Sequence, residues 1–155
     1  LEGTTSIERQ QRAESIAAEQ GLTIVPAFDD MDIIAGQGTT AIEILEDWPD
    51  VEVILVPIGG GGLISGIAAY VKQTRPDIRV IGVEPEAAAT AHASREAGER
   101  VLLPSVETMA DGVAVKRVGE RTFPIIVGLT LLAWRRWRRH RCRRWRQWLC
   151  HRQEC

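Results

Sequence analysis

A run of four glycines, Gly59 to Gly62, is the feature of this 155-residue sequence that most directly predicts chemistry. It follows an apolar run over residues 51–58 and precedes a helical pattern that begins at Leu63. Glycine loses more backbone entropy on folding than any other residue, and a simple turn needs only one or two glycines. Backbone N–H groups at the start of a helix bind anions well, because the helix dipole adds to their hydrogen bonds. The pattern therefore predicts a phosphate site.

The same residues have three alternative interpretations. The nucleotide-binding loop G-x-x-x-x-G-K-[ST] is excluded because no lysine follows the glycines. The dinucleotide fingerprint G-x-G-x-x-G is also out of register, since Gly60 and Gly62 would need a third glycine where Ser65 stands. Glu84 lies where a ribose-binding acid would be expected, but it lacks that context. The remaining alternative is a flexible turn without a ligand.

The elements around the glycines predict an α/β fold. The near-continuous apolar run at 51–58 is typical of a parallel strand buried on both faces, and 79–83 predicts a second such strand. With the helix between them they form a βαβ unit, so we expect a partial parallel sheet with flanking helices. We expect further helices at 6–20, 39–47 and 87–98, and a short strand at 22–25. Residues 101–108 are expected to be irregular, and 121–130 could be strand or helix.

Composition limits the class of protein. Residues 1–134 carry 10 basic and 20 acidic side chains, whereas 135–155 carry nine arginines and one glutamate. All three cysteines lie in this last segment, so the body is no disulfide scaffold. No signal peptide or membrane-spanning run is found, and we expect a cytoplasmic protein without a membrane partner. The first residue is Leu rather than Met, so we expect a longer parent chain.

Four ordered blocks identify a family. The glycine run, as Val56 to Gly66, resembles the tetraglycine loop of the threonine dehydratase and serine racemase family of pyridoxal-phosphate enzymes. The other matching blocks are Phe28-Asp29-Asp30 with Ile34 to Thr39, Ile81 to Glu86, and Thr108 to Val115. The resemblance covers about residues 5–127. It implies a fragment of the large domain of the fold type II pyridoxal-phosphate enzymes.

The resemblance also implies a site. Gly59, Gly60, Gly61, Gly62 and the Leu63 amide would hold the phosphate of pyridoxal 5'-phosphate, and Gly112 would lie near its ring. The lysine that forms the Schiff base belongs to a segment upstream of these blocks in the family. We expect neither Lys72 nor Lys116 to take that role, so no catalytic residue is predicted in this chain.

A divalent cation is a further implication of the resemblance. Some family members bind one beside the acid that corresponds to Glu84, with a second acid a few residues later. Residues 87–90 of this sequence contain no acid. We therefore expect Glu84 to act as a hydrogen-bonding strand-end acid rather than as a metal ligand, with the cation site as the alternative.

The implied function is that of a threonine or serine ammonia-lyase, which eliminates the β-hydroxyl to give a 2-oxo acid and ammonia. The intact parent is expected to be a homo-oligomer that acts on a small amino acid and binds no nucleic acid, while the fragment alone is expected to be inactive. One alternative is a serine racemase of the same family. Another is a non-catalytic protein that binds phosphate or uses its basic tail for interactions.

Three domains or segments are expected: 1–30 as the end of the small domain, 31–127 as the core of the large one, and 128–155 as an aberrant, disordered tail. We favour a reading-frame error as the origin of the tail, because its Arg, Trp and Cys content begins where the resemblance ends. One alternative is a cationic amphipathic helix, since four tryptophans share an arc of about 80° at helical spacing. The other is a metal site. The residues involved are Trp134, Trp137, Trp145 and Trp148 for the helix, and His140, Cys142, Cys150, His151 and Cys155 for the metal.

Overall fold

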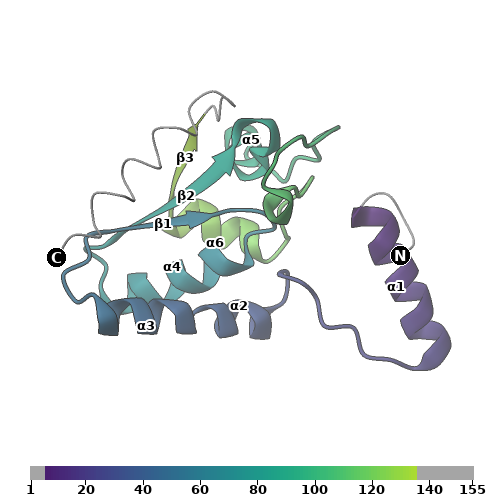
Figure 1. The fold of residues 1–155 in the computed structure, drawn as a ribbon, viewed down its shortest axis with the longest axis horizontal. Helices are drawn as coiled ribbons and strands as arrows, with labels where there is room; N and C mark the ends of the chain where they lie inside the picture. Colours follow the sequence, from purple (N-terminus) through teal and green to yellow (C-terminus); the bar gives the residue numbers. More distant parts are fainter. Residues whose placement is uncertain (1–5, 136–155) are drawn as a thin grey trace, which may run out of the picture.

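The computed structural model describes residues 6–135 and has the expected α/β fold. Its sheet contains three parallel strands in the order β1 (Val53–Pro57), β2 (Arg79–Pro85) and β3 (Leu131–Arg135). Leu55 pairs with Ile81 and Ile81 with Leu131, so the three strands are in register across the sheet. The strand, helix and strand predicted around the glycine run are confirmed (Figure 1).

Helix α4 (Gly62–Thr74) joins β1 to β2 and is the centre of the helical layer. It packs against α2, α3 and α6 as well as against both of these strands. Figure 1 shows these helices together along one side of the sheet. Their bounds are Met31–Gln37 for α2, Thr39–Asp47 for α3 and Thr122–Leu129 for α6.

The hydrophobic core fills the space between this layer and the sheet. Alternate residues of β1 and β2 enter it, because successive side chains of a strand point to opposite faces. Helix α4 contributes side chains at helical spacing. The main buried side chains are Ile54, Val56 and Ile58 before the helix, Ile64, Ile67 and Val71 within it, and Ile78, Val80, Val118 and Ile126 after it.

The expectation that β1 and β2 are buried on both faces is wrong within the described chain. Leu55 of β1 is 64% exposed and Val83 of β2 is 36% exposed, although both residues lie within their strands. The chain crosses from β1 to β2 and on to β3 in one direction. Right-handed crossovers in a constant direction place their helices on the same face, so nothing in residues 6–135 covers the other one.

The first part of the chain departs from expectation in another way. Helix α1 (Ser6–Gln20) ends at Gly21, which has φ +66°, as predicted. No strand forms at residues 22–25, where Leu22, Ile24 and Val25 are exposed in an extended linker. A strand needs a neighbour for its backbone hydrogen bonds, and Figure 1 shows α1 and this linker away from the sheet. That residues 1–30 end a separate domain stays a prediction.

After β2 the chain forms short helices and irregular segments. A 3₁₀ turn, η1 (Glu86–Ala88), precedes α5 (Thr90–Ala97), which ends at Gly98 with φ +74°. Residues 101–108 are irregular, as expected, and η2 (Asp111–Val113) follows them. The ambiguous segment 121–130 is mainly helix α6.

Two elements continue past the boundary that the sequence placed at residue 127. Helix α6 ends at Leu129, and residues 131–135 pair with β2 as β3. The boundary at residue 127 and the disorder of the segment after it stay predictions. The expectations for residues 136–155 concern a part of the chain that lies outside the described residues.

The one-sided burial of β1 makes a prediction about two neighbouring side chains. Ile54 is 7% exposed and Leu55 is 64% exposed. Ile54→Ala should lower the free energy of unfolding by about 2–5 kcal/mol, because it leaves a cavity in the core. Leu55→Ala should lower it by less than about 1 kcal/mol. Urea unfolding of the two variants measures both effects, and equal losses would show that the open face is covered in solution.

Candidate functional site

The glycine run lies at the carboxyl end of β1, where the chain turns into α4. Ligands of open α/β sheets bind beyond this end of the strands. Ile58 still bonds to β2 through its N–H to Val83 O, at 3.0 Å. Helix α4 begins at Gly62, and Gly61 is its N-terminal boundary residue. The turn is thus made by residues 59–61.

Gly61 has φ +99° and ψ 0°, a backbone conformation that L side chains rarely adopt. Its carbonyl accepts from Ser65 N at 3.0 Å, which forms the first turn of α4. The preceding carbonyl, Gly60 O, accepts from Gly119 N at 3.1 Å and from Thr122 Oγ1 at 2.7 Å. The loop is therefore fixed from the α6 side of the molecule.

The need for glycine comes largely from this packing. A Cβ at Gly60 would meet the ring of Phe28, and one at Gly62 would lie 2.9 Å from the Phe28 Cβ. At Gly61 a Cβ would lie 2.6 Å from Ile126 Cδ1 and 2.9 Å from Thr122 Cβ. We expected a ligand to require four glycines, but protein neighbours already forbid side chains at these three positions.

The hydrogen bonding of the backbone N–H groups is a second feature of the loop. Within residues 6–135, no protein acceptor bonds to the backbone N–H of Gly60, Gly61, Gly62 or Leu63. The three glycines are buried and Leu63 is half-buried. Buried backbone N–H groups nearly always have a partner, and those at a helix start suit an anion. These residues fit a phosphate group.

The structure brings Gly112 to the same place. Gly112 lies in η2, and its carbonyl oxygen is 3.3 Å from the position of a Cβ on Gly59. Its own N–H donates to Asp111 Oδ1 at 2.8 Å. The 49 residues between the glycine run and Gly112 thus fold so that two of the resembling blocks are neighbours. The role of Gly112 near a cofactor ring remains a prediction.

Neither lysine of the described chain points to a catalytic role. The Lys72 Nζ donates to Ile78 O and, at 3.1 Å, to Pro76 O beyond the end of α4. The Lys116 Nζ donates to Pro104 O at 3.1 Å. Both ammonium groups therefore bond to loop carbonyls.

Glu84 is buried at the end of β2, on the covered face of the sheet. Its Oε1 accepts from Ala91 N at 2.7 Å and its Oε2 from His92 N at 2.9 Å, both in the first turn of α5. This is the hydrogen-bonding role that we expected of a strand-end acid. Among the described residues, no group of three His, Cys, Asp or Glu side chains is placed to hold a metal ion.

Burial raises the pKa of the Glu84 carboxyl above its ordinary value, although the Ala91 and His92 N–H groups oppose this shift. A carboxyl whose pKa rises on folding stabilises the fold more when it is protonated. Lowering the pH from 7 should therefore stabilise the wild-type chain relative to Glu84→Gln, until the pH reaches the ordinary pKa of glutamic acid. Urea unfolding of both variants over this pH range measures the difference. A wild-type chain that loses stability relative to Glu84→Gln as the pH falls would contradict the raised pKa.

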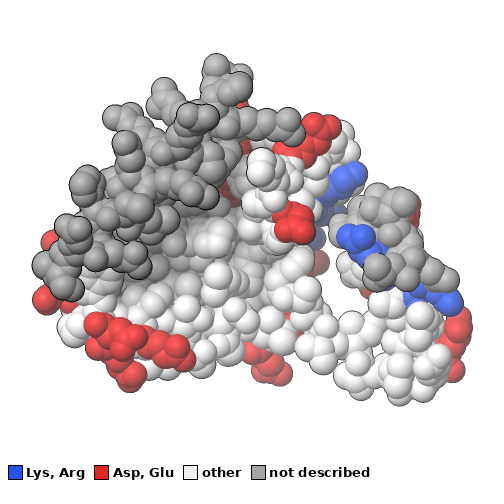
Figure 2. All heavy atoms as spheres, in the orientation of Figure 1, with Lys and Arg blue, Asp and Glu red and all other residues white. Residues whose placement is uncertain are grey.

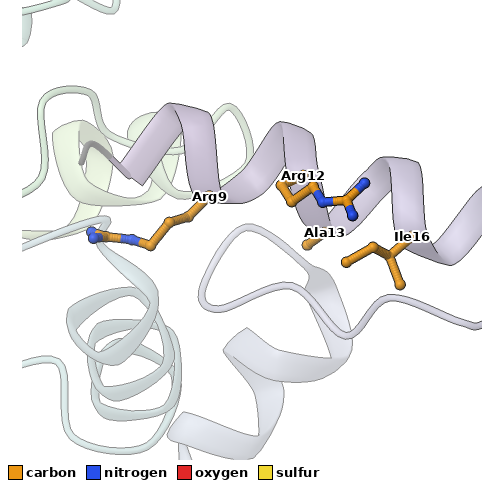
Figure 3. Close-up of a pocket in the computed structure, with 4 residues that line it drawn as sticks. All are labelled: Arg9, Arg12, Ala13 and Ile16. Atoms are coloured by element: carbon orange, nitrogen blue, oxygen red, sulfur yellow. The ribbon is translucent and has the colours of Figure 1, made fainter. Parts of the chain in front are cut away.

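Two hollows in the described surface lie apart from the glycine run. One has a volume of about 340 Å³ and is lined by Arg9, Arg12, Ala13 and Ile16. Figure 3 shows these four side chains along one side of α1. The other, of about 590 Å³, lies between α5 and residues 103–107 and includes Glu86, Glu96 and Glu107. Neither contains a residue of the predicted site, so the candidate site rests on the backbone of the loop.

The charge of the body is not concentrated at the glycine run. Figure 2 shows a cluster of acidic side chains over α3, which contributes the exposed Glu43, Glu46 and Asp47. No helix in the described part of the chain is long and apolar enough to cross a membrane.

Comparison with known proteins places these features in a family. The model of the family described as "Pyridoxal-phosphate dependent enzyme" matches residues 3–151. This match continues into the segment that we interpreted as a product of a reading-frame error. L-threonine ammonia-lyase of Geobacter sulfurreducens is 49% identical over 126 residues, which are 81% of this chain and 31% of that protein. The chloroplastic threonine dehydratase of Arabidopsis thaliana is 51% identical over 126 residues, which are 81% of this chain and 21% of that protein.

Solved structures agree with the sequence relatives. The processed form of threonine deaminase isoform 2 from Solanum lycopersicum has a TM-score of 0.83 and 42% identity, over 88% of this chain and 40% of that one. Maize serine racemase has a TM-score of 0.81 and 34% identity, over 86% of this chain and 42% of that one. The chain thus spans less than half the length of these proteins.

Proposed function

Because this chain belongs to the pyridoxal-phosphate dependent enzymes, we propose that its glycine loop holds the cofactor phosphate of a threonine or serine ammonia-lyase. The named relatives are threonine ammonia-lyases and dehydratases that are about half identical to it. Since the chain covers a third or less of those relatives, the activity proposed is that of the whole protein. We expect the whole protein to act on a small amino acid, to release a 2-oxo acid and ammonia, and to be a homo-oligomer.

The observation that carries the proposal is the set of N–H groups at the start of α4. Gly60, Gly61, Gly62 and Leu63 have N–H groups without a protein acceptor in the described chain, next to the positive end of a 13-residue helix. A dianionic phosphate would accept several of these bonds at once, and each charge-assisted bond contributes about 1.5–3 kcal/mol. We include Gly59, which forms the turn beside Gly112, in the same site.

In the proposed site the described residues bind and orient the cofactor, and we assign no proton transfer to them. Pyridoxal phosphate, when bound, supplies an electron sink for the charge that develops on the substrate. The loop would fix its phosphate, and the backbone at Gly112 would border its ring. The close packing of Phe28 and Thr122 behind the loop keeps it rigid, which lowers the cost of ordering a site.

The choice between lyase and racemase depends on residues beyond the loop. Maize serine racemase is also a structural neighbour, at 34% identity, so racemisation of serine is the alternative function. A product assay on the whole protein separates the two activities. The relatives include bacterial and chloroplastic enzymes, and the cytoplasmic location expected from the sequence stays a prediction.

Phosphate binding by the loop can be tested on this chain with inorganic phosphate. Titration followed by the amide NMR signals should shift Gly60, Gly61, Gly62 and Leu63 together. Gly61→Ala should abolish the shifts, because a Cβ there is strained and lies 2.6 Å from Ile126 Cδ1. The matched control is Gly98→Ala. It also changes a glycine with positive φ, but in open space at the end of α5, so it should leave the shifts intact.

The contradictory result is equally specific. Shifts confined to the arginine-rich segment, with none at the loop, would mean that the glycine run is only a tightly packed turn.

We also predict that this chain alone has no dehydratase activity. Lys72 and Lys116 are its only lysines, and their ammonium groups bond to the carbonyls of Pro76 and Ile78 and of Pro104, respectively. Incubation with pyridoxal phosphate and threonine should therefore give no 2-oxobutanoate above the rate of the cofactor without protein. Turnover that is lost in Lys72→Ala or Lys116→Ala would contradict this assignment.

A further inference from the structure

The carbonyl of Gly60 is held by two hydrogen bonds from the same short segment of the chain. Gly119 N donates to it at 3.1 Å and Thr122 Oγ1 at 2.7 Å. Thr122 is fully buried, so its hydroxyl has no competing partner in solvent. Thr122 is the first residue of α6 and Gly119 lies three residues before it, about 60 residues after the loop.

These two bonds fix the orientation of a whole peptide group. The Gly60–Gly61 peptide is trans, so its C=O and N–H point in opposite directions. Because Gly119 and Thr122 hold the Gly60 oxygen toward α6, the Gly61 N–H is turned away from α6. Since Gly60 and Gly61 carry no side chain, this peptide could rotate easily without the two bonds.

Asp29 holds the two donors in place. Its Oδ2 accepts from Glu120 N at 2.7 Å, and its Oδ1 accepts from Arg121 N at 2.8 Å and from Thr122 N at 3.4 Å. One carboxylate thus binds three successive N–H groups at the start of α6, where a negative charge is favoured by the helix dipole. A Cβ on Gly119 would meet the Asp29 carboxylate, so the approach is as close as the backbone allows.

We propose that Asp29 and Thr122 are positioning residues of the glycine loop, which act through the Gly60 carbonyl to aim the Gly61 N–H at the bound phosphate. The inference rests on the proposed function for the phosphate itself. The orientation of the peptide is a property of the protein without a ligand. The two parts can therefore fail separately.

Thr122 allows a test with matched variants. Thr122→Val keeps the shape of the side chain and removes the hydroxyl, whereas Thr122→Ser keeps the hydroxyl. Thr130→Val is the control, because Thr130 is also buried and donates to Ile126 O at 2.7 Å, but at the other end of α6. Inorganic phosphate, titrated against each variant by amide NMR, is the probe.

We expect Thr122→Val and Thr130→Val to differ in phosphate affinity but not in stability. Thr122→Val and Thr130→Val should lose similar stability, since each removes one buried hydrogen bond. Only Thr122→Val should weaken phosphate binding, by about tenfold, the equivalent of one misdirected N–H···O bond. Thr122→Ser should retain the wild-type affinity. Equal phosphate affinity in Thr122→Val and the wild type would overturn the proposal.

A second readout needs no ligand. The residual dipolar coupling of the Gly61 N–H reports the direction of that bond, and it should change in Thr122→Val and in Asp29→Asn but not in Thr130→Val. Asp30→Asn is the control for Asp29, since Asp30 caps α2 through Asp32 N and Ile33 N.

The outcomes of this readout separate the two ideas. An unchanged Gly61 coupling in Thr122→Val would overturn the positioning role, whether or not phosphate binds. A changed coupling in a chain whose loop binds no phosphate would support the positioning role and refute the phosphate site.

Discussion

The close approach of protein side chains to the glycine run is the constraint on which the rest of the structure depends. Phe28 packs where side chains of Gly60 and Gly62 would lie, and Thr122 and Ile126 pack where a side chain of Gly61 would lie. Three segments far apart in the sequence therefore meet at one turn. This contact seats α6 on α4 and places η2 beside Gly59. It leaves the N–H groups at the start of α4 without a protein acceptor among residues 6–135.

Much of this arrangement could be predicted from local sequence. The apolar run, the glycines and the helical pattern after them define β1, the turn and α4, because each depends on neighbours within about ten residues. The pairing of β2 with β1 follows from the same unit. The blocks that resemble the family also indicated that Gly112 belongs with the loop, although it lies 50 positions after Gly62.

Other features depend on contacts that no local pattern reveals. The bonds from Asp29 to the start of α6 join residues 91–93 positions apart, and Asp29 is one acid among many in the sequence. The extended residues 22–25 have the composition of a strand but lie away from the sheet. The open face of the sheet follows from the order of the strands, which apolar runs alone do not specify. From the sequence we attributed the need for four glycines to a ligand. In the structure, close packing of protein side chains already requires glycine at Gly60, Gly61 and Gly62.

We propose that the glycine run presents its N–H groups to a phosphate because Gly119 and Thr122 hold the Gly60 carbonyl on the opposite side. A crystal structure of this chain grown with pyridoxal phosphate tests it most directly. The account predicts the phosphate within hydrogen-bonding distance of the Gly61, Gly62 and Leu63 nitrogens, with Thr122 Oγ1 still bonded to Gly60 O. A phosphate bound elsewhere, with these N–H groups bonded to protein acceptors, would contradict it.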